Sequence, residues 1–440
     1  MTALAAAAPW WLWGLAAMGV VGVVAVIVTL FVALGARPQE VSAPDLPAVG
    51  SDAFLAATAA VVNAPIRTGG TIRLLHNGDG FLPFLLDDLA TARLSITFSV
   101  YIWEEGEMSA RIWEVLIERA RAGVAVRLLL DGVGGFGADE DRIEALEAAG
   151  GRVDRFRPPR FGKLTRLHRR NHRRAIVIDG MVGYTGGAAV GDNWLGDARH
   201  PGEWREMMVR GTGPFARSIQ AAFAGSWAAV TGEILAGEAF YSGAPDGQEA
   251  PSDGEAGPTH HLSVVSSPAD EAHPLRKFFW ISFAAASERI WITASYFAPD
   301  EHLRAALEER ARAGVDVRLI LPNEHTDARP VRWAGQGYYE ELLESGVRIF
   351  EYQPTFMHAK ALVVDSVWSV VGTANLDIRS KELNEENVIG VQGRDLAAAL
   401  EAAFEADLQS SEEILLDGWR KRPIHWRVRE RISLLFAEQM

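Results

Sequence analysis

Apolar residues recur along the chain with two different spacings, separated by short polar turns. Short runs rich in β-branched and aliphatic residues, as in residues 94–103 and 289–297, are typical of buried strands. Apolar residues spaced three and four apart lead to Gly123 and Gly314 and indicate helices that end at a glycine. Strands and helices alternate, which predicts an α/β fold with a parallel-type sheet and helices on its faces.

This series of elements occurs twice. Residues 118–130, ERARAGVAVRLLL, recur as residues 309–321, ERARAGVDVRLIL, at a constant offset of 191 residues. A helix that ends at a glycine could produce part of the match by chance, but the shared strand behind it favours a duplicated unit. In both copies a second helix and strand follow, at residues 146–153 and 342–349. We therefore expect two similar α/β lobes.

We place the first lobe at residues 65–240 and the second at residues 261–418. The intervening residues 241–260 are rich in glycine, proline and acidic residues, as is typical of a linker. Residues 37–64 are interpreted as a linker ahead of the first lobe. Residues 419–440 form a basic amphipathic segment, which is either an interfacial membrane helix or a terminal helix docked on the second lobe.

The N-terminal residues 1–36 carry no charged side chain, and residues 10–34 are nearly all apolar. As a helix, the apolar run would be about 37 Å long, enough to cross a hydrocarbon core of ~30 Å. A cleaved signal peptide or a buried helix are the alternatives, but a signal peptide has a basic start and a shorter apolar run. We expect one transmembrane anchor, with Arg37 favouring a cytoplasmic body.

Composition narrows the chemistry further. Hydrophobic residues make up 48% of the 440 residues, which indicates a globular chain with a substantial core. The absence of cysteine excludes disulfides, thiolate zinc sites, iron–sulfur clusters and a cysteine nucleophile. A formal net charge of −14 argues against nonspecific binding of duplex nucleic acid through overall charge.

Near the end of each half, a histidine is followed two residues later by a cation. The segments read HRRAIVID, which starts at His172, and HAKALVVD, which starts at His358. Their aliphatic runs predict strands, in which His172 and Arg174 share a face, as do His358 and Lys360. A histidine beside a fixed cation is a poor metal ligand but suits an anion.

Each segment ends in an aspartate, Asp179 or Asp365, seven residues after the histidine. In a regular strand these carboxylates lie on the opposite face from the histidines, so we expect them to support the strand or its loop. A glycine follows seven residues after each aspartate, in the pairs Gly186-Gly187 and Gly372-Thr373.

Two histidine–cation pairs that faced one phosphate would suit phosphodiester transfer. One neutral imidazole would attack phosphorus to form a phosphohistidine, and the other, protonated, would give its proton to the leaving alkoxide. Arg174 and Lys360 would neutralise the nonbridging oxygens, so neither a metal ion nor another cofactor is required.

Each imidazole also needs a partner on its other ring nitrogen, to fix the tautomer and stabilise the charged form. Glu206 and Glu386 each lie downstream of the histidine in their own half, and we assign them as these partners. Tyr101 and Tyr296 occupy similar places in the two halves; they either line the pocket or pack in the core.

At these residues the sequence resembles the phospholipase D superfamily, whose signature HxK-x4-D-x6-G-[GS]-x-N occurs in two copies. Within it the chain is most similar to the bacterial cardiolipin synthases, through NHRRAIVIDGMVGYTGG, EWREMMVRGTGP and EYQPTFMHAKALVVDSVWSVVGTANLDIRSKELNEEN. The resemblance covers about residues 65–420. It implies two duplicated α/β/α phospholipase D-type lobes forming a pseudo-dimer with one active site, here preceded by the predicted transmembrane helix.

The resemblance also implies residue roles: His172 as nucleophile, His358 as acid and base, and Gly187, Thr373 and Asn375 as phosphate or substrate contacts. The first half departs from the signature at two positions. Arg174 replaces lysine, which exchanges a point cation for a planar fork, and Ala189 stands where asparagine is common, as at Asn375 in the second half.

These inferences predict an anchored phosphatidyltransferase of the bacterial inner membrane that makes cardiolipin from phosphatidylglycerol. Residues 152–174 carry ten Lys/Arg and one acid, which favours an anionic lipid headgroup or membrane surface. Solvated surface or a nucleic-acid groove are the alternatives, but aromatic residues for base stacking are sparse there. There are two rival functions. One is hydrolysis of phospholipid or, less expectedly, of nucleic acid, and the other is lipid binding by a catalytically impaired protein.

Overall fold

The computed structural model describes residues 41–43, 45–159, 169–241, 259–268 and 273–434, together with Gly19 and Gly22. The chain divides into two units, Met1–Ala43 and Pro44–Met440, and both lobes belong to the second. Apart from Gly19 and Gly22, the predicted span at residues 10–34 lies outside the described residues, as does most of the linker at residues 241–260. Over the described ranges, no helix combines the length and the apolar character needed to cross a membrane.

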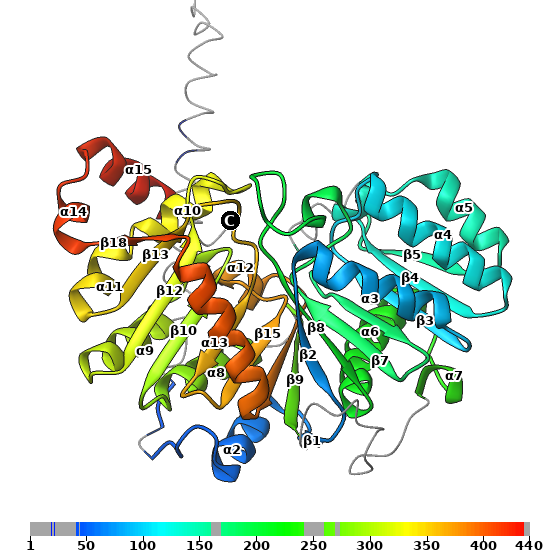
Figure 1. Ribbon diagram of the computed structural model, residues 1–440, viewed down its shortest axis with the longest axis horizontal. Helices are drawn as coiled ribbons and strands as arrows, with labels where there is room; N and C mark the ends of the chain where they lie inside the picture. Colours follow the sequence, from blue (N-terminus) through cyan, green and yellow to red (C-terminus); the bar gives the residue numbers. More distant parts are fainter. Residues whose placement is uncertain are drawn as a thin grey trace, which may run out of the picture. The chain divides into compact units, whose positions relative to one another are not determined.

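The first lobe contains a seven-stranded sheet in the order β2-β8-β7-β6-β3-β4-β5 (Figure 1). Its strands are β2 (Ile72–His76), β3 (Ser95–Val100), β4 (Ala125–Asp131), β5 (Arg152–Phe156), β6 (Ala175–Ile178), β7 (Val182–Gly186) and β8 (Met207–Thr212). Strands β3, β4 and β5 are parallel, whereas β6 pairs antiparallel with β3 and β7.

The second lobe contains a nine-stranded sheet in the order β1-β9-β17-β15-β14-β10-β12-β13-β18. Its strands are β1 (Arg67–Thr68), β9 (His260–Ser266), β10 (Arg289–Thr293), β12 (Asp316–Pro322), β13 (Arg348–Tyr352), β14 (Ala361–Val364), β15 (Trp368–Gly372), β17 (Glu386–Gln392) and β18 (Ser411–Ile414). A separate parallel pair joins β11 (Phe297–Ala298) to β16 (Leu376–Asp377).

The seven central strands of the second sheet repeat the first sheet in the same order, as a duplication requires. Both sheets are mixed, so the expected parallel-type sheet is correct only for three consecutive strands of each lobe. The difference arises because the histidine-containing segments lead into tight hairpins, β6–β7 and β14–β15, which necessarily pair antiparallel.

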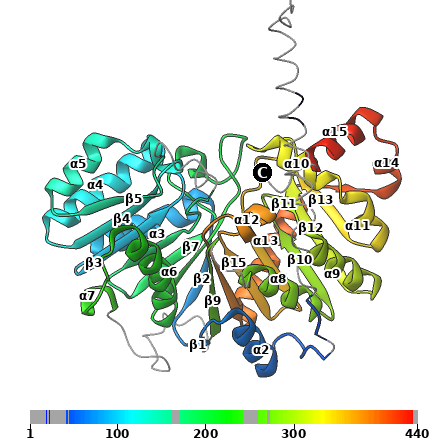
Figure 2. The ribbon, with the colours of Figure 1, turned by 180° about the vertical axis from the view of Figure 1, so that it is seen from behind.

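Helices cover both faces of each sheet (Figures 1 and 2). Those of the first lobe are α3 (Asn77–Thr91), α4 (Glu107–Arg121), η1 (Gly134–Gly137), α5 (Glu140–Ala148), η3 (Asp192–Trp194), α6 (Pro214–Thr231) and α7 (Glu238–Tyr241). Those of the second are α8 (Pro274–Ala284), α9 (Glu301–Arg312), α10 (Arg329–Gln336), α11 (Tyr339–Ser345), α12 (Ile378–Glu382), α13 (Arg394–Leu408), α14 (Leu416–Arg420) and α15 (Ile424–Leu434).

The repeated ERARAG sequence forms the end of α4 and of α9, as predicted. The helices give way to Gly123 and Gly314, whose φ angles of 89° and 91° are readily adopted only by glycine. The buried strands β4 and β12 follow directly.

Residues 52–68 depart from the predicted boundaries. Within the expected linker at residues 37–64, Asp52–Val62 forms helix α2, whose Phe54 and Leu55 pack in the core of the second lobe. Strand β1, expected in the first lobe, pairs with β9 of the second. The apolar face of α2 explains the difference, because a helix beside this core buries that face.

A third hydrophobic core lies between the two sheets and contains residues of both lobes. It includes Phe223 and Trp227 of α6 together with Trp291 of β10 and Phe404 of α13. The lobes therefore share an interior, and both histidine motifs lie where the lobes meet.

Candidate active site

The two histidines occupy equivalent positions, in short extended segments just ahead of β6 and β14. His172 and His358 are both buried. We expected strands to include them, but β6 begins at Ala175 and β14 at Ala361. The histidine segments make their backbone hydrogen bonds to the other lobe instead.

Two isolated parallel bridges connect the lobes here. The backbone N–H of His172 donates to the carbonyl oxygen of Glu385 at 2.9 Å, and that of His358 donates to the carbonyl oxygen of Arg205 at 2.8 Å. In each bridge, the residue just before a histidine pairs with the residue just before a glutamate of the other lobe. The histidine and the glutamate therefore lie next to each other.

The imidazoles pair with these glutamates across the lobes. His172 Nδ1 lies 2.9 Å from both carboxylate oxygens of Glu386, and His358 Nδ1 lies 2.6 Å from Glu206 Oε2. The sequence had suggested partners within each half, which was wrong, because the bridges bring the opposite lobe's carboxylate to each ring. One site therefore uses both lobes.

Both carboxylates are fully buried and are held by further donors. Thr373 donates its hydroxyl to Glu386, so the structure gives this side chain a positioning role. Glu206 accepts from the indole N–H of Trp194 at 3.2 Å and from the backbone of Met207 at 2.9 Å. A Cβ on Gly187 would lie 2.6 Å from a Glu206 oxygen, so glycine admits the carboxylate there.

The two cations lie beside their own histidines. Lys360 Nζ donates to the carbonyl of His358 at 2.6 Å and lies 3.3 Å from the ring nitrogens. Arg174 donates to the carbonyl of His172 at 2.7 Å and is also buried. The planar guanidinium thus occupies the position of the lysine in the signature, and it donates to backbone oxygens on one side.

Burial lowers the pKa of three side chains in this cluster. It lowers the pKa of His172 to about 4, with help from the adjacent Arg174, and that of His358 to about 3, with help from Lys360. Burial likewise lowers the pKa of Lys360 to about 8, against the charge of Glu206. Near neutral pH both imidazoles are therefore neutral, and each lies beside a carboxylate of the other lobe and the cation of its own motif.

Charges from both lobes act on one another within this cluster. Lys360 lowers the pKa of His172 and Arg174 lowers that of His358, although each cation belongs to the other lobe's sequence motif. Such mutual influence means that the two motifs form one electrostatic unit.

Aromatic rings surround the imidazoles. The Tyr101 ring meets His172 edge-on with centroids 5.1 Å apart. Around His358 lie Trp194, Trp204 and Phe356, with centroids 5.4, 5.2 and 5.4 Å away. All three were missed from the sequence. Phe356 stands two residues before His358, a spacing that puts both side chains on one side of an extended segment, whereas no such spacing relates Trp194 or Trp204 to the histidine motif.

Tyr296 lies beside Phe356, one of the rings that contact His358. Its ring centroid is 6.1 Å from that of Phe356, and its hydroxyl donates to Asp327. Asn375 accepts from the Ser295 hydroxyl at 2.8 Å, whereas Ala189 is part of the first lobe's apolar core. The lobes therefore differ in polarity at this equivalent pair of positions.

Asp179 and Asp365 lie at the far ends of β6 and β14 from the histidines. Asp179 accepts from three consecutive backbone N–H groups at residues 93–95, and Asp365 from those at residues 287–289. Both adopt positive φ, 53° and 49°. They fix the hairpin turns to the start of β3 and β10.

Buried ion pairs connect the two lobes around the site, and they were not predicted from the sequence. Arg205 donates to Asp407 at 2.8 Å, and Arg173 lies 3.3 Å from Glu385. Arg205 and Glu385 stand directly before the two glutamates that pair with the histidines. Their ion-pair partners lie far away in the chain, so the sequence did not indicate the pairs.

Duplicated α/β lobes that bring two histidines, two cations and two crossed glutamates into one buried cluster define a phospholipase D-like enzyme. The family model described as "Cardiolipin synthase, PLD-like domain" matches residues 281–408. Cardiolipin synthase 2 of Bacillus anthracis is 36% identical over 81% of this chain and 68% of its own length. A cardiolipin synthase of Geobacillus kaustophilus is 33% identical over 85% of this chain and 73% of its own length.

The fold has a solved counterpart in the phosphatidylserine synthase of Haemophilus influenzae. That structure has a TM-score of 0.66 and 13% sequence identity, and the match covers 88% of this chain and 99% of the other. The likeness concerns the fold. The sequence relatives show more: the chain belongs to the cardiolipin synthase family and is an enzyme of the phospholipase D superfamily.

Proposed function

We propose that this enzyme makes cardiolipin by moving a phosphatidyl group from one phosphatidylglycerol to the hydroxyl of another. The observation that carries the proposal is the crossed pairing of His172 with Glu386 and of His358 with Glu206. In both pairs Nδ1 is taken by a carboxylate, which leaves Nε2 for the reaction.

In the first step His172 Nε2 attacks phosphorus and a P–N bond forms. The bond from phosphorus to the glycerol oxygen breaks, and His358 donates its proton to that oxygen, so glycerol leaves. The Nδ1–H of His172 donates to the Glu386 carboxylate, which stabilises the positive ring of the intermediate.

In the second step the hydroxyl of another phosphatidylglycerol attacks phosphorus. His358 now takes the hydroxyl proton, the P–N bond breaks, and cardiolipin leaves with His172 restored. Throughout, Arg174 and Lys360 balance charge on the nonbridging oxygens, so we propose that the reaction proceeds without a metal ion.

Substrate binding supplies the protonation state that the first step needs. The free site holds neutral imidazoles because burial lowers both pKa values. One negative charge about 4 Å away contributes about 4 kcal/mol at an effective dielectric of 20, or about three pKa units. The diester anion thus favours one protonated ring, and the coupled pair gains a single proton.

Membrane attachment is part of the same proposal. The apolar run at residues 10–34 would anchor the enzyme in the bacterial inner membrane beside its lipid substrate, with the body on the cytoplasmic side. Sequence similarity to cardiolipin synthases supports phospholipid as the substrate class.

The test uses the full chain in detergent with phosphatidylglycerol and EDTA, followed by separation of the lipid products. Cardiolipin and glycerol in equal amounts are expected. Phosphatidic acid as the main product would show that the enzyme hydrolyses the lipid instead of transferring the phosphatidyl group. Cleavage of single-stranded DNA instead of lipid would show that the substrate is a nucleic acid.

Variants assign the result to the site. His172→Ala and His358→Ala are each expected to abolish turnover, and retention by either would overturn the two-histidine proposal. Arg174→Lys tests whether the guanidinium impairs the enzyme. Activity that appears only in this variant would support the lipid-binding alternative for the natural chain.

A further inference from the structure

Helix α15 is oriented with its polar residues toward the protein. Glu430 and Ser433 are buried, whereas Ile424, Val428 and Ile432 are 79%, 52% and 53% exposed. The three apolar residues are four apart, so they share one side of the helix. Surface helices of globular proteins normally do the opposite and bury the apolar side.

Specific contacts hold this orientation. Glu430 accepts from Arg422 at 2.9 Å, and Arg422 also reaches Glu340 of α11 at 3.3 Å. The Arg429 guanidinium lies over the Trp333 ring of α10, 4.5 Å from its centroid. Turning the helix to bury its isoleucines would separate Arg422 from a carboxylate whose side chain is almost fully buried.

The outward side of α15 is basic as well as apolar. Arg427 and Arg431 are exposed and lie three and seven residues after Ile424, next to the apolar row. Glu430 is the single acidic residue between residues 419 and 434, and it faces inward. Exposed apolar side chains flanked by arginines match the interface of an anionic bilayer, where both kinds of group find partners.

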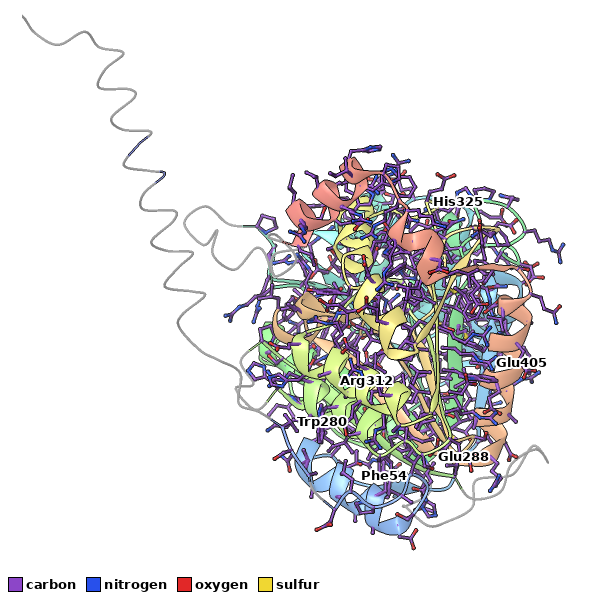
Figure 3. All side chains as sticks on the ribbon, turned by 90° about the vertical axis from the view of Figure 1, so that its left-hand side faces the viewer. Phe54, Trp280, Glu288, Arg312, His325 and Glu405 are labelled. Atoms are coloured by element: carbon purple, nitrogen blue, oxygen red, sulfur yellow. The ribbon has the colours of Figure 1, made fainter. Side chains whose placement is uncertain are left out.

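This helix lies at the edge of the second sheet where β12 ends and β14 begins. α15 packs against α10, which follows the carboxyl end of β12, and β14 begins at that edge directly after Lys360. Figure 3 shows His325, just beyond β12, at the end of the molecule where α15 lies, and Glu288, just before β10, at the other end.

The first lobe presents an apolar side chain at the equivalent edge of its own sheet. Phe136 of η1 is 64% exposed and follows the carboxyl end of β4. The same short helix includes Gly134, where a Cβ would meet the backbone oxygen of Tyr101, the residue that contacts His172. Both lobes thus expose apolar side chains at the edge of the sheet where the histidine motif leads into its strand.

We propose that α15, with η1, docks this edge of the enzyme on the surface of an anionic phospholipid bilayer. Ile424, Val428 and Ile432 enter the boundary between headgroups and acyl chains, and Arg427 and Arg431 contact anionic headgroups. The choice of a bilayer as occupant rests on the proposed function, because that substrate is itself an anionic membrane lipid. Docking would present the buried histidines to the headgroup layer.

The absence of cysteine permits a direct test. In the full chain, Val428→Cys introduces a single thiol for an environment-sensitive fluorophore, and the protein is reconstituted in vesicles of phosphatidylglycerol and phosphatidylcholine. We expect the emission to shift to shorter wavelength and to be quenched by lipids brominated in their acyl chains. Vesicles of phosphatidylcholine alone should give weaker quenching, because the arginines lose their anionic partners.

Met181→Cys is the matched control. Met181 is an apolar residue with 50% exposure, but it lies in the β6–β7 turn at the opposite edge of the sheet. Its label should remain unquenched in the same vesicles. Adding Ile424→Ser and Ile432→Ser to the Val428→Cys chain should abolish the quenching, and both positions are exposed enough to leave the fold intact.

An unquenched Val428→Cys label in phosphatidylglycerol vesicles would overturn the proposal. A shift that needs no lipid and grows with protein concentration would overturn it in favour of a second copy of the chain. Quenching does not require catalysis, so lost quenching with normal cardiolipin formation rejects only the docking surface. Quenching without cardiolipin formation supports docking and rejects only the proposed reaction.

Discussion

Each imidazole of the candidate site lies between a carboxylate that favours its charged form and a cation that opposes it. Burial decides the balance in the free enzyme, since it lowers the pKa of His172 to about 4 and that of His358 to about 3. The site is therefore poised to change protonation when an anion arrives, and this behaviour can be measured.

Ligand binding should be accompanied by proton uptake. At pH 6, both imidazoles of the free enzyme are neutral, and a bound phosphodiester raises their pKa, so about one proton is taken up. Calorimetry in buffers of different ionisation enthalpy measures it, with a phosphonate analogue of short-chain phosphatidylglycerol that cannot react. Binding without proton uptake would contradict the proposed charge balance.

Lys360 should set the alkaline limit of activity. Its pKa is lowered to about 8 by burial, so the charge that balances the phosphate is lost as the pH rises through that value. Lys360→Arg keeps the charge and should move the alkaline fall in kcat/KM to higher pH, while Arg174→Lys should not. An unchanged profile in Lys360→Arg would assign the alkaline limit to another group.

At the scale of elements, local sequence patterns predicted much of the fold. The repeated helix ends at Gly123 and Gly314 and the strands behind them form where expected, because propensity, capping and apolar spacing act within a few residues. Helix α2 was missed since its partner, the core of the second lobe, lies two hundred residues further along the chain.

The histidines and cations of the candidate site could be read from their motif, but their carboxylate pairing could not. Which glutamate meets which histidine depends on two bridges between lobes, at Glu385 and Arg205. Those contacts join residues far apart in the sequence, and neither residue carries a local signal of its partner. Trp194 and Trp204, which lie beside His358, were missed for the same reason.

Thr373, at the end of the β14–β15 hairpin, should act on turnover through Glu386. Thr373→Val removes the hydroxyl that the carboxylate accepts, at a cost of about 1.5–3 kcal/mol for a hydrogen bond to a charged group. We expect kcat to fall roughly tenfold or more with little change in KM, and Thr373→Ser to restore it. A rise in KM at constant kcat would instead indicate direct substrate contact.

The core between the sheets contains residues of both lobes, so we expect the lobes to unfold as one cooperative unit. Urea unfolding of the detergent-solubilised chain should give coincident transitions by tryptophan fluorescence and circular dichroism. Two separated transitions would show that the lobes are independent.

The ion pair at the lobe interface should contribute strongly to this unit. Asp407→Ala leaves Arg205 buried without its carboxylate, and we expect a loss of about 3–5 kcal/mol in the free energy of unfolding. Glu413→Gln is the matched control, because it breaks a half-exposed pair with Arg348 and should cost less than about 1 kcal/mol. Equal losses of unfolding free energy in the two variants would show that the interface ion pair contributes no more than an exposed one.

We propose that one site, built by both lobes, transfers the phosphatidyl group through a histidine. The most direct test of this proposal is the mass of the intact chain after mixing with phosphatidylglycerol and quenching in base, where a P–N bond survives. A phosphatidyl adduct that maps to His172 during turnover, and disappears in His172→Ala, is the predicted result. Steady cardiolipin formation with an adduct on neither histidine would contradict the account.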